Sequence, residues 1–194
     1  MATNRRDHLV DTALKLFCRD GFHATGIDTI LAEAGVAKMT LYKHFKSKDE
    51  LILAALRRQD EQFRNWFMRS VERRGRTSAE RLVAIFDVLE ERCSDRGFRG
   101  CAFINASAEY GSHEDPIHAV AAESKRLTCA YLRELAVDAG AEDPEELARQ
   151  LMLLMEGAIV LTQVTGEPGA TGQARKAASV LVRHALGDGS QDRG

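Results

Sequence analysis

The sequence predicts an all-α protein, and three observations lead to this prediction. Apolar residues recur mostly three and four positions apart, which is the spacing of one helical face. No segment shows the period-two alternation of a half-buried strand. The chain of 194 residues contains only three prolines, and proline is the residue that most strongly interrupts a helix. We therefore expect about nine helices.

The first helix is expected over residues 4–20. Asn4 or Thr3 can cap its N-terminus, and Gly21 ends it. Arg5 and Arg6 lie at its start, where positive charge opposes the helix dipole. These two arginines either face phosphate groups or belong to a frayed, solvated terminus, and the sequence leaves both interpretations open.

Two short helices joined by a tight turn follow. Thr25 is the expected N-cap of the first, and Gly35 ends it because glycine adopts the left-handed conformation most easily. The second is expected over residues 38–45. Leu41 and Phe45 are four positions apart on it and are predicted to point inward.

Capping residues and glycines set the bounds of the remaining elements. Ser47 and Glu50 form a capping box at the start of the fourth helix, and Ser78 is expected to cap the fifth. A basic, polar stretch at 69–77 predicts a loop. Two Asp-Pro pairs, at 115–116 and 143–144, each place an N-cap Asp before a Pro at the first helical position. The expected helices are 47–70, 78–95, 101–110, 116–139, 144–165 and 171–186, followed by a disordered tail from Gly187.

The charge is unevenly distributed. The net charge of −2 and pI near 6.3 exclude a protein that binds any polyanion, such as an architectural DNA protein. Residues 1–50 contain eight Lys or Arg against seven Asp or Glu, whereas residues 38–48 contain four lysines, one histidine and no acidic residue. These charges are compatible with a protein that binds a polyanion sequence-specifically through a local basic face.

A helix, a glycine turn and a short helix with a basic and aromatic outer face form a helix-turn-helix that can lie in a DNA major groove. The alternative is an ordinary helical hairpin with a solvated charged face. Met39 and Tyr42 lie outside the apolar stripe, where a solvated surface more often carries Glu, Gln or Ala. These two residues favour the DNA-binding interpretation.

The same stretch resembles the signature of the TetR/AcrR family of transcriptional regulators. The resemblance covers about the first quarter of the chain, and the rest matches the family only in its length and helical pattern. It rests on Thr40-Leu41-Tyr42-Lys43-His44-Phe45, Lys48 and Leu51, and upstream on Ala13, Phe17, Gly21, Thr25, Ala32, Gly35 and Val36. It implies a DNA-binding domain at 1–50, a ligand-binding and dimerisation domain at 51–186 and a tail at 187–194.

The resemblance also implies which residues meet DNA. Thr25, as a helix cap, is expected to reach a phosphate group. Lys43 and Lys48 are expected to hold phosphates as well, and Lys48 adds its charge to the dipole of the helix that it begins. The residues expected to face the major groove are Lys38, Met39, Thr40, Tyr42 and His44.

An effector site would lie in a second core. Its expected lining is Phe67, Phe86, Leu89, Phe103, Ser107, Tyr110, Met152 and Met155, although each of these residues could equally be packed core. Asn105, Glu109 and Glu156 are polar within apolar stretches. A buried carboxylate needs a partner, which could be an arginine, a tyrosine hydroxyl or a cationic ligand. A surface location explains all three residues equally well.

The last two helices are apolar on more than one side. Such helices must bury both sides, in a large single core or against a partner. The family resemblance implies a four-helix interface between two copies. Its expected residues are Leu151, Leu154, Ala158, Ala174, Ala178 and Leu181.

Other classes of protein find little support. No catalytic motif or cofactor loop is present, and no CxxC pair indicates a metal site. His113 and His118 are expected to diverge across Pro116. Cys101, at a helix start, is either a redox-sensitive thiol or a small buried hydrophobe. Without an export signal the cysteines should be reduced in the cytoplasm, and the stretch 151–164 is too short to span a membrane.

The sequence therefore predicts a cytoplasmic homodimeric regulator without a cofactor, which binds a palindromic double-stranded DNA operator. It is expected to act as a repressor that a small-molecule effector releases. The alternative is a soluble helical ligand-binding protein or enzyme whose N-terminus only resembles a DNA reader.

Overall fold

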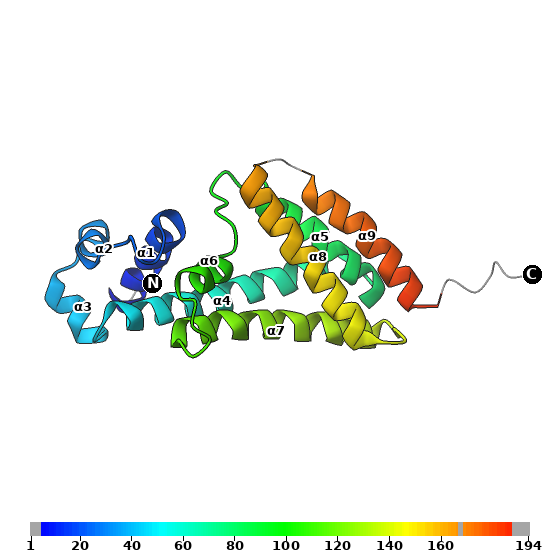
Figure 1. The fold of residues 1–194 in the computed structure, drawn as a ribbon, viewed down its shortest axis with the longest axis horizontal. Coiled ribbons are helices and arrows are strands. Elements are labelled where there is room, and N and C mark those ends of the chain that lie inside the picture. The colour runs from blue at the N-terminus through cyan, green and yellow to red at the C-terminus, as the bar shows by residue number, and fades with distance from the viewer. Residues whose placement is uncertain (1–4, 167–168, 188–194) are drawn as a thin grey trace, which may run out of the picture. The chain divides into compact units, whose positions relative to one another are not determined.

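The computed structural model describes residues 5–166 and 169–187, and helices are the only regular elements in these ranges (Figure 1). The prediction of an all-α protein with about nine helices is confirmed. The helices are α1 (Arg5–Asp20), α2 (Ile27–Ala34), α3 (Lys38–His44), α4 (Lys48–Arg74), α5 (Ser78–Cys93), α6 (Ala102–Glu109), α7 (Pro116–Asp138), α8 (Pro144–Thr165) and α9 (Ala170–Ala185). The expected caps Thr3 and Asn4, and the expected disordered tail beyond Gly187, lie outside the described residues.

The chain forms two compact units whose bounds differ from a division at residue 50. Among the described residues, the first unit contains 5–63 and 101–124, and the second contains 64–100, 125–166 and 169–187. The first unit thus includes α6 and the first turns of α7 besides α1, α2, α3 and more than half of α4. Each unit is built from two separate stretches of the chain.

The first unit has an apolar core in which α1 is central. Leu9, Leu16 and Phe17 of α1 are almost completely buried, and the Phe17 ring stacks on Phe22 with centroids 5.3 Å apart. Burying such a side chain contributes about 1.5–3 kcal/mol. The same core includes Phe103 of α6, so α6 helps to fix the short helices that follow α1.

The turns around α2 and α3 differ from the expected ones in two details. Gly35 ends α2 with a φ of 62°, as predicted. Thr25 is not the cap of α2, because the cap position is Gly26. At the start of α4 the Ser47 hydroxyl accepts a hydrogen bond from the Glu50 N–H at 3.2 Å. The Glu50 carboxylate reaches past Ser47 and accepts from the Lys46 N–H at 2.7 Å, so the capping box is shifted by one residue.

In the second unit α5 packs against both α8 and α9. The loop expected at 69–77 is shorter than predicted, because α4 continues to Arg74. Ser70 and Val71 are buried and hold this last part of the helix in the core. Arg74 donates to the Ser70 carbonyl at 3.2 Å, and a cation at a helix C-terminus is favourable.

The cap of α5 is Thr77, not Ser78. The Thr77 hydroxyl accepts a hydrogen bond from the Glu80 N–H at 3.2 Å. The Glu80 carboxylate accepts in turn from the Thr77 N–H, which completes a capping box.

The two predicted Asp-Pro helix starts are confirmed, and one prediction nearby is wrong. Asp115 accepts from the Ile117 N–H at 2.7 Å, and Asp143 accepts from the Glu146 N–H at 2.9 Å. His113 and His118 do not diverge, because their rings lie 4.5 Å apart. The turn closed by the Asp115 N–H and the Ser112 carbonyl brings His113 over the first turn of α7.

α8 is long and apolar enough to cross a membrane by length and composition alone. The core helix of a soluble protein passes the same test, and α8 packs on α5 and α9. It also carries Glu156, whose carboxylate oxygens lie 2.8 and 2.7 Å from the ammonium of Lys125. The partner of Glu156 is therefore a lysine of the same unit.

Candidate DNA-binding surface

The exposed side of α3 follows from the way the helix is anchored. Leu41 is fully buried and Phe45 is 4% exposed, so these two residues fix α3 on the core. Met39 and Tyr42 lie on the other side and are 82% and 51% exposed. The two side chains line one hollow together, and this grouping of exposed apolar groups fits a surface that contacts something else.

Most of the predicted groove-facing residues lie together. A hollow of about 510 Å³ lies on this side of the first unit. Its lining is Arg5, Met39, Thr40, Tyr42, Lys43 and His44. The named lining residues include an arginine, a lysine and no carboxylate, so the hollow favours an anionic partner. Arg5 comes from the start of α1, which supports the interpretation that this arginine faces phosphate groups.

Lys38 lies at the edge of this surface and not in the hollow. Its ammonium is 3.8 Å from a carboxylate oxygen of Asp28 in the first turn of α2. Both side chains are mostly exposed, and an ion pair of this kind contributes little to stability. The ammonium of Lys38 can therefore exchange this carboxylate for another partner at little cost.

Lys48 holds a turn of its own unit. Its ammonium donates a hydrogen bond to the carbonyl of His23 at 2.9 Å, in the turn between α1 and α2. An ammonium has three donors, so this contact leaves capacity for a phosphate oxygen. The sequence pattern indicated the charge of Lys48 but not this second contact.

Thr25 does not belong to the exposed surface. Its side chain is 2% exposed, and its hydroxyl donates to the Gly21 carbonyl at 2.6 Å. This bond fixes the turn after α1 and directs the hydroxyl proton to a backbone carbonyl. The expected contact of Thr25 with a phosphate stays a prediction.

Glu109 is a residue of this unit that the sequence left unresolved. It is the last residue of α6, and its two carboxylate oxygens accept from the backbone N–H groups of Phe22 and His23 at 2.8 and 2.6 Å. Burial raises the pKa of Glu109, but the N–H groups of His23 and Phe22 and the His23 ring outweigh it and lower that pKa below its usual value. The only sequence signal for this role was a carboxylate in an apolar stretch.

The expected effector residues divide between the two units. Phe67, Phe86, Leu89 and Met155 are buried in the second unit, and Met152 is half-buried there. Phe103, Ser107 and Tyr110 belong to the first unit, where Phe103 is part of the core. Tyr110 stacks on His23 with centroids 4.6 Å apart, and burial, with nearby carboxylates, raises its pKa to about 12.

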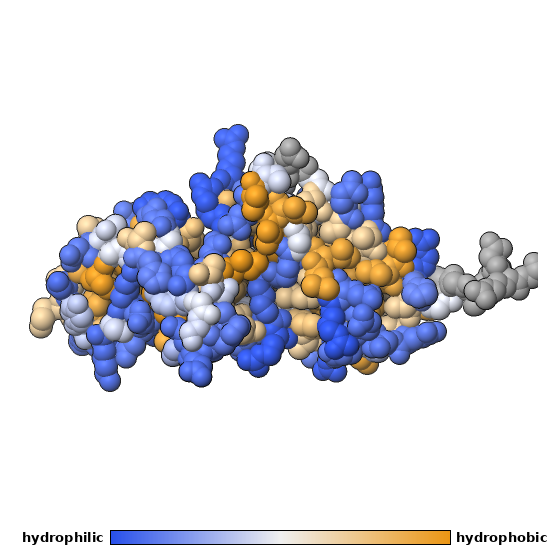
Figure 2. Space-filling model, in the orientation of Figure 1, coloured by the Kyte–Doolittle hydropathy of each residue, from blue (hydrophilic) through white to orange (hydrophobic). Residues whose placement is uncertain are grey.

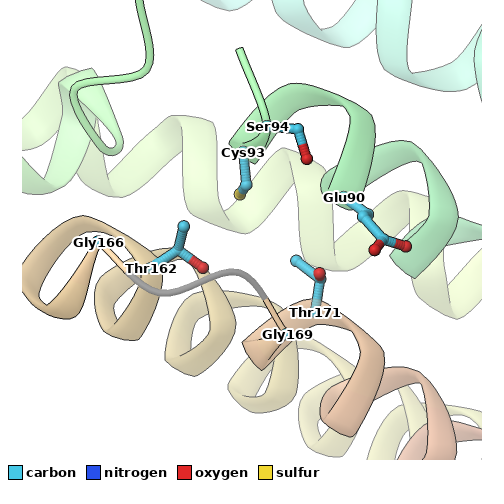
Figure 3. Close-up of a pocket in the computed structure, with 7 residues that line it drawn as sticks. All are labelled: Glu90, Cys93, Ser94, Thr162, Gly166, Gly169 and Thr171. Carbon is cyan, nitrogen blue, oxygen red and sulfur yellow. The ribbon is translucent and has the colours of Figure 1, made fainter. Parts of the chain in front are cut away.

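A different set of residues lines a cavity of about 270 Å³ in the second unit (Figure 3). The lining comes from the C-terminal ends of α5 and α8 and the start of α9, and comprises Glu90, Cys93, Ser94, Thr162, Gly166, Gly169 and Thr171. None of these was an expected effector residue. Hydroxyl groups and one carboxylate predominate, and burial raises the pKa of the Cys93 thiol, which keeps that thiol protonated at neutral pH.

Most of the residues expected at the interface between copies are covered within the chain itself. Leu151, Ala158, Ala174 and Ala178 are at most 7% exposed, because α8, α9 and α5 pack on one another. Leu154 and Leu181 are half-buried. The exposed apolar residues of α8 and α9 lie on the other sides of these two helices (Figure 2). They are Leu153, Val160, Leu161, Val164 and Val180.

Two parts of the chain match known protein families. Residues 9–55 match the family described as bacterial regulatory proteins, tetR family. Residues 78–178 match the domain described as tetracyclin repressor-like, C-terminal domain. The chain therefore belongs to the TetR family of transcriptional regulators, a regulatory and not an enzymatic family of soluble DNA-binding proteins.

Individual relatives align over most of the chain. The HTH-type transcriptional regulator YjdC of Escherichia coli is 24% identical over 181 residues, or 93% of this chain and 95% of that protein. The HTH-type transcriptional repressor NemR of Escherichia coli is 24% identical over 169 residues, or 82% and 84%. SCO4454, a TetR-family transcriptional regulator from Streptomyces coelicolor, is a solved structure with a TM-score of 0.87 and 30% identity, covering 94% and 96% of the two chains.

Proposed function

We propose that this regulator binds a palindromic operator as a homodimer and represses transcription until a small-molecule effector releases it. One observation carries the proposal: the exposed side of α3 combines Met39, Thr40, Tyr42, Lys43 and His44 in a single hollow without a carboxylate in its lining. NemR, a relative over most of the chain, is named a transcriptional repressor, which supports the sign of regulation.

The chemistry of the hollow and of the residues beside it suits both parts of DNA recognition. Thr40 and Met39 can pack on a thymine methyl, and Lys38 can donate to guanine O6 or N7. Tyr42 can donate its hydroxyl to a phosphate oxygen while its ring packs on a sugar. Arg5, Lys43 and Lys48 supply positive charge for phosphates. Base contacts thus come from the first turn of α3 and phosphate contacts from its flanks.

A second copy would cover the exposed apolar residues of α8 and α9. Leu153, Val160, Leu161 and Val164 recur at spacings of seven, one and three along α8, so they form one stripe. On α9 the side chain of Val180 is 59% exposed and adds to this apolar surface. A two-fold axis would pair this surface with itself. It would also present two copies of α3, whose half-sites are expected about 34–36 Å apart on DNA.

The effector is expected to bind the second unit. The candidate site is the cavity at the ends of α5 and α8. Its lining includes the carboxylate of Glu90 and three hydroxyl-bearing residues, which favour a small cationic or hydroxyl-rich compound. Release of DNA requires that the effector bind two states of the dimer with different affinity, typically by about 1–3 kcal/mol. The aromatic set around Phe67 and Phe86 stays a prediction.

The proposal is tested by selecting bound fragments from the source genome and measuring binding with competitor DNA. We expect one palindromic sequence to be enriched. Lys43→Ala should weaken binding to all sequences alike and reduce the salt dependence by about one unit per half-site. Lys15→Ala is the matched control, because Lys15 is an exposed lysine on α1 outside the hollow. Equal effects of the two substitutions, or enrichment of no sequence, would contradict the proposal.

A further inference from the structure

The turn between α1 and α2 is built around a carboxylate from a distant part of the chain. One oxygen of Glu109 accepts from the Phe22 N–H at 2.8 Å. The other accepts from the His23 N–H at 2.6 Å and lies 3.0 Å from Nδ1 of the same residue. The adjacent Tyr110 ring stacks on the His23 ring. The last residue of α6 and the residue that follows it thus hold the same turn.

This arrangement is specific and not a chance surface contact. Successive backbone N–H groups form a concavity that binds anions, and Glu109 supplies the anion. Glu109 is also the last residue of α6, where the helix dipole disfavours negative charge, so the contacts with the turn must outweigh that cost. At Gly21 (φ 94°) an added Cβ would lie 3.2 Å from the Glu109 carboxylate, and the absence of a side chain there gives the carboxylate its room.

The other side of the same turn is bound to the DNA-binding surface. The carbonyl of His23 accepts from the ammonium of Lys48 at 2.9 Å. Lys48 begins α4 directly after α3. The carboxylate of Glu109 and the ammonium of Lys48 therefore bind the same residue of the turn, His23, one through its N–H and the other through its carbonyl.

We propose that Glu109 is a positioning residue for DNA binding, which acts through the His23 turn to place the Lys48 ammonium for a phosphate. This inference depends on the proposed function, because the quantity that Glu109 changes is the affinity for operator DNA. Glu109 does not contact DNA in this proposal. It fixes the His23 turn, and the turn fixes the direction in which the Lys48 ammonium can donate a hydrogen bond.

The proposal and its simplest alternative predict opposite signs. If Glu109 were only a negative charge near a polyanion, its neutralisation would strengthen DNA binding by removing repulsion. If it positions Lys48, its neutralisation weakens binding. A glutamine retains the shape of the side chain but replaces one acceptor oxygen with an NH2 donor, so it cannot offer a separate oxygen to each of the two N–H groups.

The experiment measures the operator affinity of the full-length Glu109→Gln variant. We expect about a tenfold loss, the size associated with one charge-assisted hydrogen bond. Glu114→Gln is the matched control, since Glu114 is an exposed carboxylate of the same unit, and it should bind as tightly as the wild type. Glu109→Asp keeps the charge but is too short for both contacts, so it should also lose affinity. It provides the same test if the glutamine variant does not fold.

A double-mutant cycle with Lys48→Ala separates positioning from general destabilisation. In the Lys48→Ala background, Glu109→Gln should cost about twofold or less, because the group that it positions is gone. In a Lys43→Ala background it should keep its full effect. Equal costs in all three backgrounds would overturn the proposal, and so would tighter binding by the single Glu109→Gln variant.

The outcomes also separate this inference from the function on which it depends. A wild-type protein that selects no DNA sequence would overturn both. A wild-type protein that binds its operator, with Glu109→Gln and Glu109→Asp binding equally well, would overturn only the role of Glu109.

Discussion

Two exposed surfaces of this chain differ in chemistry, and each suits a different kind of partner. The surface on α3 is polar and cationic, with Arg5, Lys43 and His44 around Thr40 and Tyr42. The surface on α8 and α9 is aliphatic, with Leu153, Leu161 and Val164 more than half exposed. Charge attracts a polyanion from solution but is screened by salt, whereas apolar burial is insensitive to moderate salt. The comparison indicates that DNA binding and self-association can be disturbed separately.

Salt should give the largest effect. In the proposed homodimer, Arg5, Lys43 and Lys48 of the two copies would provide six phosphate contacts, for which we expect a rise from about 50 to 200 mM salt to cost roughly a thousandfold in affinity. The dimer should persist over the same range. Binding titrations and analytical ultracentrifugation at each salt concentration check this. Dissociation of the dimer in parallel with the DNA would remove the distinction between the two surfaces.

A charge in the aliphatic surface should have the next largest effect. Leu161→Glu should give a monomer and lower operator affinity by about a hundredfold, because a buried unpaired carboxylate costs several kcal/mol and a single half-site binds weakly. Val137→Glu is the matched control, since Val137 is 52% exposed on α7. Sedimentation that shows a dimer for Leu161→Glu would place the interface elsewhere.

A substitution in the hollow should change which sequence is bound. Thr40→Ala should relax or alter the preference at one base pair of each half-site, by about 1–3 kcal/mol, as expected for a lost base contact. It should leave the oligomeric state unchanged. Selection from random DNA with the wild type and the variant compares the preferred sites, and identical sites would exclude Thr40 from base recognition.

Acid should give the smallest effect, confined to the Glu109 turn. The pKa of Glu109 is lowered in the folded state from an ordinary value of 4.5, so its stabilising contribution is present above that value and is lost as the pH falls through the lowered pKa. Urea unfolding between about pH 6 and 3 should therefore show a steeper acid loss for the wild type than for Glu109→Gln. Glu114→Gln should follow the wild type.

The α3 surface could be predicted from the sequence because its pattern is local. Leu41 and Phe45 are four positions apart and anchor the helix, which leaves Met39 and Tyr42 outside. The same reasoning was insufficient for α8, which is apolar on two sides. The periodic pattern predicts that both apolar sides of α8 must be buried. It does not show which side packs against α5 and which remains exposed on the monomer.

The contacts of Glu109 could not be predicted for a different reason. The partners Phe22 and His23 are 87 and 86 residues away in the sequence, and only the folded chain brings them together. The loop expected at 69–77 failed for a related reason. Its polar composition is typical of a loop, yet Ser70 and Val71 are buried by tertiary packing, which overrides local propensity.

The composition of the first unit has a consequence for how the protein is made. Residues 5–63 and 101–124 form this unit together, and Phe103 and Ile117 are buried in its core. We therefore expect the helix-turn-helix to complete folding only after residues 101–124 have been synthesised, because it lacks part of its hydrophobic support until then. Because chain elongation adds about 5–20 residues per second, the nascent segment should pass several seconds as an incompletely packed intermediate whose apolar side chains are accessible to chaperones.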